Sequence, residues 1–161
     1  MWKNGKISDR CAAFENEGRE KLRIEAFHDN CLRVTFTRGK EFLLRDEPMI
    51  VARPEGALTL QQSEDGWLLA SGRLSARLDA ATGALSYFAD GQPLLREKEK
   101  GGRQLRDIDI LCYRYDPDAP LMERMGVDGA RVTAQGEPYV DRKGFQTRLN
   151  LVFAEGESLW G

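Results

Sequence analysis

The chain has 161 residues, of which 41% are hydrophobic, so it is long and apolar enough for one domain with a core. Lys and Arg number 24 against 26 Asp and Glu, and the two signs are interspersed, so the sequence does not predict nucleic acid as a partner. The longest apolar runs are only a few residues, and polar residues follow the N-terminus. We therefore expect no membrane span and no secretory signal peptide.

Cysteine and histidine usage limits the chemistry further. Cys11, Cys31 and Cys112 are odd in number and widely spaced, which is typical of reduced thiols and predicts a cytoplasmic protein. His28 is the only histidine, and no residues have metal-ligand spacing, so no metal site is expected. Residues 101–103 (Gly-Gly-Arg) lack the helix and the Lys-Ser/Thr of a phosphate loop, and we expect no cofactor.

The first half of the chain predicts a series of hairpins. Residues 1–20 lack sustained periodicity and are predicted to form a partly ordered N-terminal arm. Apolar and polar residues then alternate over 21–27 and 32–37 on either side of the turn residues 28–30, which indicates a hairpin with one buried face. Short apolar segments follow at 41–44 and 48–52.

A second hairpin and a three-stranded meander come next. Residues 58–60 and 67–69 flank the turn Glu64-Asp65-Gly66. In Gly72–Glu97, two alternating segments flank the turn Asp79–Gly83, and a second turn at Asp90-Gly91 leads into a third apolar segment. The meander is predicted to be scaffold, with its apolar face covered by the rest of the chain.

The last third of the chain also predicts strands. Residues 96–103 carry mixed charges and are predicted to form a solvated loop. Alternation indicates strands at 107–115, 130–134 and 145–154, whereas 116–129 is predicted to be a loop with at most one helical turn. Many short strands with frequent turns and no span typical of a helix predict an all-β antiparallel sandwich over residues 21–161 as a single domain.

Tests for catalytic groups assign no catalytic residue. Glu155 and Glu157 have a spacing that a pair of glycosidase carboxylates could adopt, but they flank Gly156 at a strand end, where solvated charges are common. The three tryptophans are far apart in the sequence, which is more typical of core or interface positions than of a sugar-stacking platform.

Three segments together resemble the N-terminal domain of glycoside hydrolase family 31, which contains α-glucosidases and α-xylosidases. Residues 22–36 resemble its opening hairpin with an Arg-Val strand. Residues 72–97 resemble its Asp-x-x-Thr-Gly hairpin, which precedes a phenylalanine, an Asp-Gly turn and a Leu-Leu pair. Residues 153–161 are similar to its Glu-x-Leu/Phe-Tyr/Trp-Gly segment, which leads into a Gly-Leu-Gly motif.

The resemblance covers residues 21–161 and implies a galactose-mutarotase-like β-sandwich, or supersandwich, packed on a catalytic (β/α)8 barrel. In the family, the barrel supplies the aspartate nucleophile and the aspartate acid/base of a retaining α-glycosidase. This chain stops where the Gly-Leu-Gly motif would follow, so the resemblance implies an inactive domain of a longer enzyme. Leu159, Trp160 and Gly161 are then expected at the interface with the barrel.

Two other functions stay open. A stand-alone carbohydrate-binding sandwich would contact sugar through its aromatic residues. An aldose epimerase of the mutarotase fold would need more histidines than this sequence has. Exposed apolar or edge-strand surface would also allow an oligomer.

Overall fold

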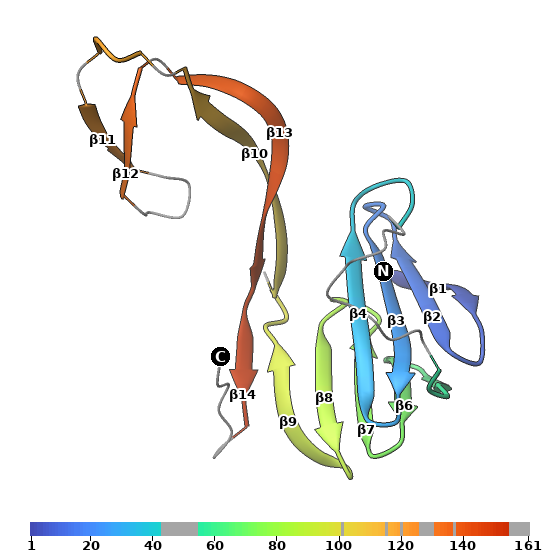
Figure 1. The fold of residues 1–161 in the computed structure, drawn as a ribbon. Coiled ribbons are helices and arrows are strands. Elements are labelled where there is room, and N and C mark those ends of the chain that lie inside the picture. The colour runs from blue at the N-terminus through green and yellow to red at the C-terminus, as the bar shows by residue number, and fades with distance from the viewer. Residues whose placement is uncertain are drawn as a thin grey trace. The chain divides into compact units, whose positions relative to one another are not determined.

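The computed structural model describes residues 1–42, 55–100, 102–114, 116–119, 121–125, 131–136 and 138–154. Within these ranges the chain forms 14 strands and no helix, which confirms the all-β prediction (Figure 1). The chain divides into two units, one of Met1–Arg103 with Arg148–Gly161 and the other of Gln104–Thr147. The assignment of residues 21–161 to one domain stays a prediction. The predicted segments at 41–44 and 48–52 lie almost wholly outside the described ranges.

The first unit contains a four-stranded antiparallel sheet in the order β1-β2-β3-β4. Its strands are β1 Trp2–Ile7, β2 Cys11–Asn16, β3 Lys21–His28 and β4 Cys31–Thr37. The predicted hairpin is β3 with β4, in a register that pairs Ile24 with Val34. Asn30 ends this turn at φ 65°, a left-handed conformation that Asn tolerates better than most residues.

The same unit contains a six-stranded antiparallel sheet in the order β14-β9-β8-β7-β6-β5. Its strands are β5 Thr59–Ser63, β6 Gly66–Ser71, β7 Leu74–Asp79, β8 Leu85–Ala89, β9 Gln92–Glu97 and β14 Leu151–Phe153. The predicted meander forms the centre of this sheet as β7, β8 and β9, and β14 pairs with β9 from the far end of the chain.

One apolar core joins the two sheets, so this unit is a β-sandwich. The four-stranded sheet contributes Trp2, Ala12, Phe14, Leu22, Ile24 and Ala26, and the six-stranded sheet with its entry contributes Leu58, Trp67, Leu69, Ala76, Leu78 and Leu85. The rings of Phe14 and Trp67 meet between the sheets with centroids 4.9 Å apart. The predicted faces of the hairpin and the meander are confirmed, because period-2 alternation places these side chains on the covered side of each sheet.

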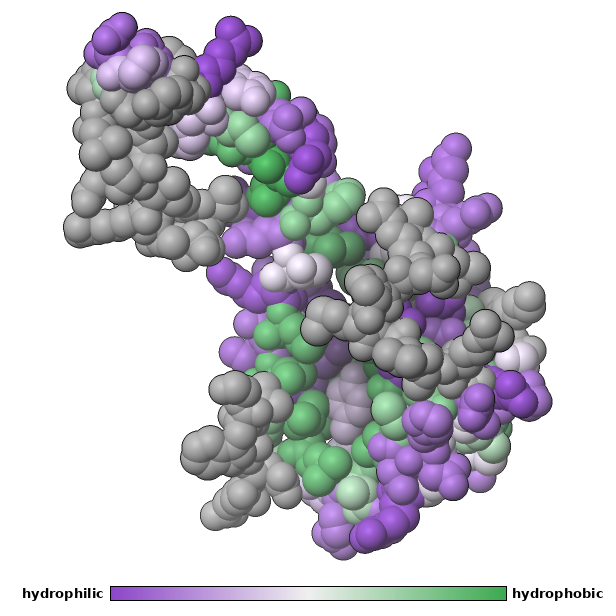
Figure 2. Space-filling view, viewed as in Figure 1, coloured by the Kyte–Doolittle hydropathy of each residue, from purple (hydrophilic) through white to green (hydrophobic). Residues whose placement is uncertain are grey.

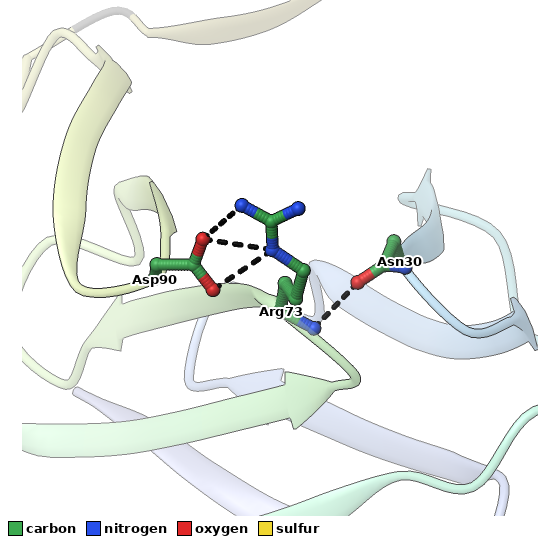
Figure 3. Close-up of polar contacts among 3 residues, drawn as sticks. All are labelled: Asn30, Arg73 and Asp90. Atoms are coloured by element: carbon green, nitrogen blue, oxygen red, sulfur yellow. Dashed lines mark hydrogen bonds and ion pairs between the residues drawn. The ribbon is translucent and has the colours of Figure 1, made fainter.

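Polar contacts tie three turns together at one end of this sandwich (Figure 3). Asn30 accepts a hydrogen bond from the backbone N–H of Arg73 through its side-chain oxygen. The Arg73 guanidinium in turn binds Asp90, with Nε 3.0 and 2.7 Å from the two carboxylate oxygens. The β3–β4, β6–β7 and β8–β9 turns are thereby linked, which fixes the relative register of the two sheets at this end.

The second unit consists of two-stranded ladders. It contains β11 Leu121–Met125 and β12 Arg131–Gln135, which pair with each other. It also contains most of β10 Arg103–Tyr113 and β13 Pro138–Leu149, which pair with each other and whose ends at Arg103 and at residues 148–149 belong to the first unit. A Cβ on Gly144 of β13 would lie 2.6 Å from Ile110 Cδ1 of β10, so glycine at this position leaves room for the isoleucine. Arg114 lies over the ring of Tyr139 with 5.6 Å between guanidinium and centroid.

Three regions differ from the sequence-based predictions. Residues 1–20, predicted as a partly ordered arm, contain β1 and β2, because Trp2 and Phe14 are covered by strands distant in the sequence. The predicted loop at 116–129 contains the strand β11, which is paired by β12 rather than signalled by its own pattern. The single strand predicted at 145–154 is interrupted at Asn150, so β13 and β14 are separate.

Candidate functional site

The predicted interface residues Leu159, Trp160 and Gly161 lie outside the described residues, as do Glu155 and Glu157. The strand β14 leads toward them and ends at Phe153. Their role therefore stays a prediction.

His28 and the three cysteines are the residues whose number limited the chemistry that the sequence predicts. His28 is exposed at the end of β3, and its carbonyl accepts a hydrogen bond of 3.2 Å from the Ser71 hydroxyl. All three cysteines are described, and none of them forms a disulfide. In the described part of the chain, no three His, Cys, Asp or Glu side chains come together as metal ligands. A search of the same residues finds no helix long and apolar enough to cross a membrane.

The most unusual group of side chains in the first unit is a buried ion pair between Glu97 and Arg103. Glu97 ends β9 and is 3% exposed, and the Arg103 side chain is 12% exposed. Arg103 Nε lies 2.9 Å from Glu97 Oε2, and the same oxygen accepts a 3.1 Å hydrogen bond from the backbone N–H of Leu85. The prediction of a solvated loop at 96–103 is therefore wrong for both residues of this pair. Strand alternation places Glu97 on the same face as Leu95.

Aromatic rings and a turn complete the surroundings of the arginine. Its guanidinium lies 5.8 Å from the ring centroid of Trp2 and 5.1 Å from that of Phe36, and it donates to the carbonyl of Gly83. Gly83 has φ 75°, and a Cβ there would overlap Trp2 Nε1. Glycine is thus required twice at this turn, for its backbone conformation and for the close approach of Trp2.

Burial dominates the electrostatics of this site. It raises the pKa of Glu97, and the Arg103 charge with the Leu85 N–H opposes that increase. Burial also raises the pKa of the neighbouring Tyr87 hydroxyl well above its usual range, and the Glu97 carboxylate adds to this effect. Tyr87 is therefore neutral at physiological pH.

A hollow of about 190 Å³ adjoins the pair. Its lining combines charged, polar and aromatic groups from both sheets, namely Trp2, Glu20, Phe36, Thr82, Gly83, Ala84, Glu97, Lys98, Glu99, Gly102 and Arg103. The Glu97 carboxylate is neutralised by its partner and held by two donors on one oxygen. These contacts suit a structural brace better than a group that exchanges protons with a substrate.

The brace lies where the chain leaves the sandwich for residues 104–147 and returns to it. The backbone N–H of Lys98 donates to Asn150 O at 3.1 Å, and the N–H of Asn150 donates to Gly102 O at 2.7 Å. Glu97 pairs with Leu151 in the β9–β14 ladder. The segment through which the chain leaves the sandwich and the segment through which it returns are therefore joined by backbone hydrogen bonds, and the ion pair lies beside them. The sequence signal for this site was the continuation of alternation from Leu95 to Glu97, which a charged run obscured.

No known family model and no curated protein matches this sequence. Among solved structures, the fold is similar to that of a glycoside hydrolase family 31 α-xylosidase from a soil metagenome, determined in complex with xylose. The TM-score is 0.55 at 19% sequence identity, and the match covers 77% of this chain. The chain spans 22% of the length of that enzyme. The comparison shows a shared fold with one part of a much larger protein.

Proposed function

We propose that this chain is a non-catalytic β-sandwich domain of a retaining α-glycosidase related to glycoside hydrolase family 31, acting on α-glucosides or α-xylosides. The fold shared with part of the α-xylosidase is the observation that carries the proposal. The order of the three sequence segments within residues 21–161 also supports it. The most distinctive of these segments is the meander, which forms the centre of the six-stranded sheet.

In this proposal the catalytic groups belong to a (β/α)8 barrel elsewhere in the parent protein. The buried carboxylate of Glu97 is neutralised by Arg103 and faces a hollow of about 190 Å³, which supports a structural rather than a hydrolytic role. Hydrolysis of an O-glycosyl bond needs two carboxyl groups, one as acid/base and one as nucleophile.

The flank formed by β9 and β14 is the proposed contact with the barrel. Leu95, Leu151 and Phe153 are only half-buried, although ladder pairing places them on the same side of the sheet as the core. Figure 2 shows apolar residues gathered over β9 and β14. Edge strands with apolar faces are commonly covered by another element. We propose that the barrel covers this flank together with Leu159, Trp160 and Gly161, and that the domain helps to shape the substrate entrance.

The parent protein is proposed to act in the cytoplasm. None of the three cysteines forms a disulfide, which is typical of proteins kept in a reducing compartment. Recovery of the parent protein in the cytoplasmic fraction of lysed cells, and not in the periplasmic fraction or the medium, would support this assignment.

Two measurements test the proposed function. The sequence that follows Gly161 in the parent gene should encode a barrel of several hundred residues, and a parent without one would end the proposal. The purified chain 1–161 should not hydrolyse p-nitrophenyl α-xyloside or α-glucoside, whereas the parent enzyme should hydrolyse at least one. Turnover by the chain alone that Glu97→Gln abolishes would instead identify Glu97 as catalytic.

A further inference from the structure

The outward face of the six-stranded sheet carries a continuous row of side chains that the proposed function does not use. Ladder pairing aligns one residue from each strand in this row, namely Gln61, Leu68, Arg77, Ser86, Arg96 and Val152. The neighbouring row pairs Ser75 with Phe88 and Phe88 with Pro93. Because side chains alternate between faces, the residues of the first row, with Ser75 and Phe88, point away from the core. A register shift in the β8–β9 ladder between Tyr87 and Phe88 brings Pro93 opposite Phe88.

Two adjoining hollows follow this face, with volumes of about 520 and 260 Å³. Phe88 and Arg77 line both hollows, and Ser86 and Arg96 line the second. Serine side chains are shorter than the arginine side chains beside them. We call the two hollows together the Phe88 trench.

The side chains of the trench offer an apolar ring flanked by hydrogen-bonding groups. Phe88 is half-buried within the sheet, so its ring is held in place by its neighbours. Gln61 and Ser75 on this face add an amide and a hydroxyl group that both donate and accept. An aromatic surface beside such groups matches a ligand that is apolar on one side of each ring and rich in hydroxyls at its edge.

Acidic residues outnumber basic ones around the trench, with Asp65, Asp79, Glu97 and Glu99 against Arg77 and Arg96. Arg77 Nη2 lies 3.5 Å from an Asp65 carboxylate oxygen, and Arg96 Nη1 lies 3.9 Å from a Glu99 carboxylate oxygen. Each guanidinium therefore has an acidic neighbour, and the trench has no cationic surface to attract a phosphate backbone or an acidic chain. A neutral ligand is favoured over an anionic one.

The length of the trench indicates an extended ligand. Arg77 on β7 and Arg96 on β9 are separated by one strand, or about 9–10 Å across the sheet. From this geometry we infer that the Phe88 trench binds a neutral oligosaccharide, laid across the strands with one sugar ring on Phe88. The inference concerns the outward face only and does not require the proposed glycosidase barrel.

Isothermal titration of chain 1–161 with neutral gluco-oligosaccharides and xylo-oligosaccharides tests the site. A saturable heat is expected with at least one series, and Phe88→Ala should weaken binding by about tenfold or more. Phe145→Ala is the matched control, because Phe145 is an exposed phenylalanine, 64% accessible, in the other unit. The control should leave the affinity unchanged. A second variant, Ser86→Arg, fills the trench without changing an aromatic or core residue and should also abolish binding.

Three outcomes would overturn the inference. They are no saturable heat with either series at millimolar oligosaccharide, binding that Phe88→Ala and Ser86→Arg both leave intact, and a dimer in sedimentation that Phe88→Ala dissociates. The last would show that the face binds a second copy of the chain. Equal unfolding midpoints of the variants and the wild type would exclude misfolding as the cause of lost binding. A parent gene without a barrel would end the proposed glycosidase function and leave this result unaffected.

Discussion

Replacing Arg103 with Leu tests whether the buried ion pair braces the sandwich. The substitution leaves the Glu97 carboxylate 3% exposed without its counter-charge, while a leucine keeps apolar contact with the rings of Trp2 and Phe36. Removal of one partner from a buried pair costs about 3–5 kcal/mol, because the remaining charge has no compensation. The donor to the Gly83 carbonyl is lost as well. We expect the free energy of unfolding to fall by an amount in that range.

The double variant Glu97→Gln/Arg103→Leu separates the charge from the packing. A glutamine at this position still offers an amide oxygen to the Leu85 N–H but carries no charge to bury. Replacement of a whole buried pair by neutral groups is often close to neutral, so the double variant should regain most of the stability lost by Arg103→Leu. Urea unfolding followed by tryptophan fluorescence measures both, with the midpoints compared at constant m-value.

The pH dependence provides an internal check on the same variant. Burial holds the pKa of Glu97 above its ordinary value of 4.5, and Arg103 opposes that increase. A carboxyl group with a raised folded-state pKa contributes stability that is fully present below its unfolded pKa and is lost as pH rises through the folded value. Without Arg103 the folded pKa should rise further, so the deficit of Arg103→Leu should shrink as pH is lowered toward 4.5. A deficit below about 1 kcal/mol at neutral pH, or a double variant no more stable than the single one, would refute the brace.

Three further predictions concern the meander. Gly83→Ala should destabilise the domain more than Gly91→Ala. Both positions have positive φ, but a Cβ at Gly83 would overlap Trp2, whereas a Cβ at Gly91 would meet nothing within 4 Å. Equal urea midpoints of the two variants would contradict the packing at Gly83. Leu85→Ala should cost about 2–5 kcal/mol in urea unfolding, because Leu85 is fully buried in the core, and a much smaller loss would mean that the site collapses around the cavity. Hydrogen bonds from its own turn lower the pKa of Asp79. The wild type should therefore have a larger free energy of unfolding than Asp79→Ala above the ordinary pKa of 3.8, and the difference should decline as pH falls below that value. A difference that does not change with pH in acid unfolding would contradict this.

Local pattern was sufficient to predict the central strands. In the hairpin of residues 21–37 and in the meander of Gly72–Glu97, apolar residues alternate over several positions and turn residues separate the segments. Every fully buried leucine of these strands, such as Leu22, Leu78 and Leu85, lies on the predicted face. Alternation and turn chemistry act over a few residues, so one sequence contains enough information to read them.

The parts that the sequence did not predict depend on distant partners. Trp2 becomes buried because the β7–β8 turn and Arg103 lie against it, and neither neighbour can be inferred from residues 1–20. In the sequence, Glu97 has the pattern of a solvated charge. In the structure it is neutralised by Arg103, six positions later in the chain. The candidate site is made almost entirely of such long-range contacts, which explains why its residues were predicted as loop and arm.

The unit of residues 104–147 has little of the burial that stabilises the sandwich, and this difference has a measurable consequence. Ile108, Ile110 and Cys112 share one face of β10 but are only half-buried, while Leu111 and Phe145 are 48% and 64% exposed. Two-stranded β-structure is at best marginally stable in water without a further layer to cover it.

Hydrogen exchange of chain 1–161 should therefore show the amides of β10 and β13 exchanging much faster than those of β6, β7 and β8, because local opening of the former exposes little apolar surface. Equal protection in both units, independent of protein concentration, would contradict this reasoning. Protection of β10 and β13 that rises with protein concentration would show that a second copy covers them. Protection that appears only in the parent enzyme would show that the exposed side chains of residues 104–147 are part of the surface that the proposed barrel completes.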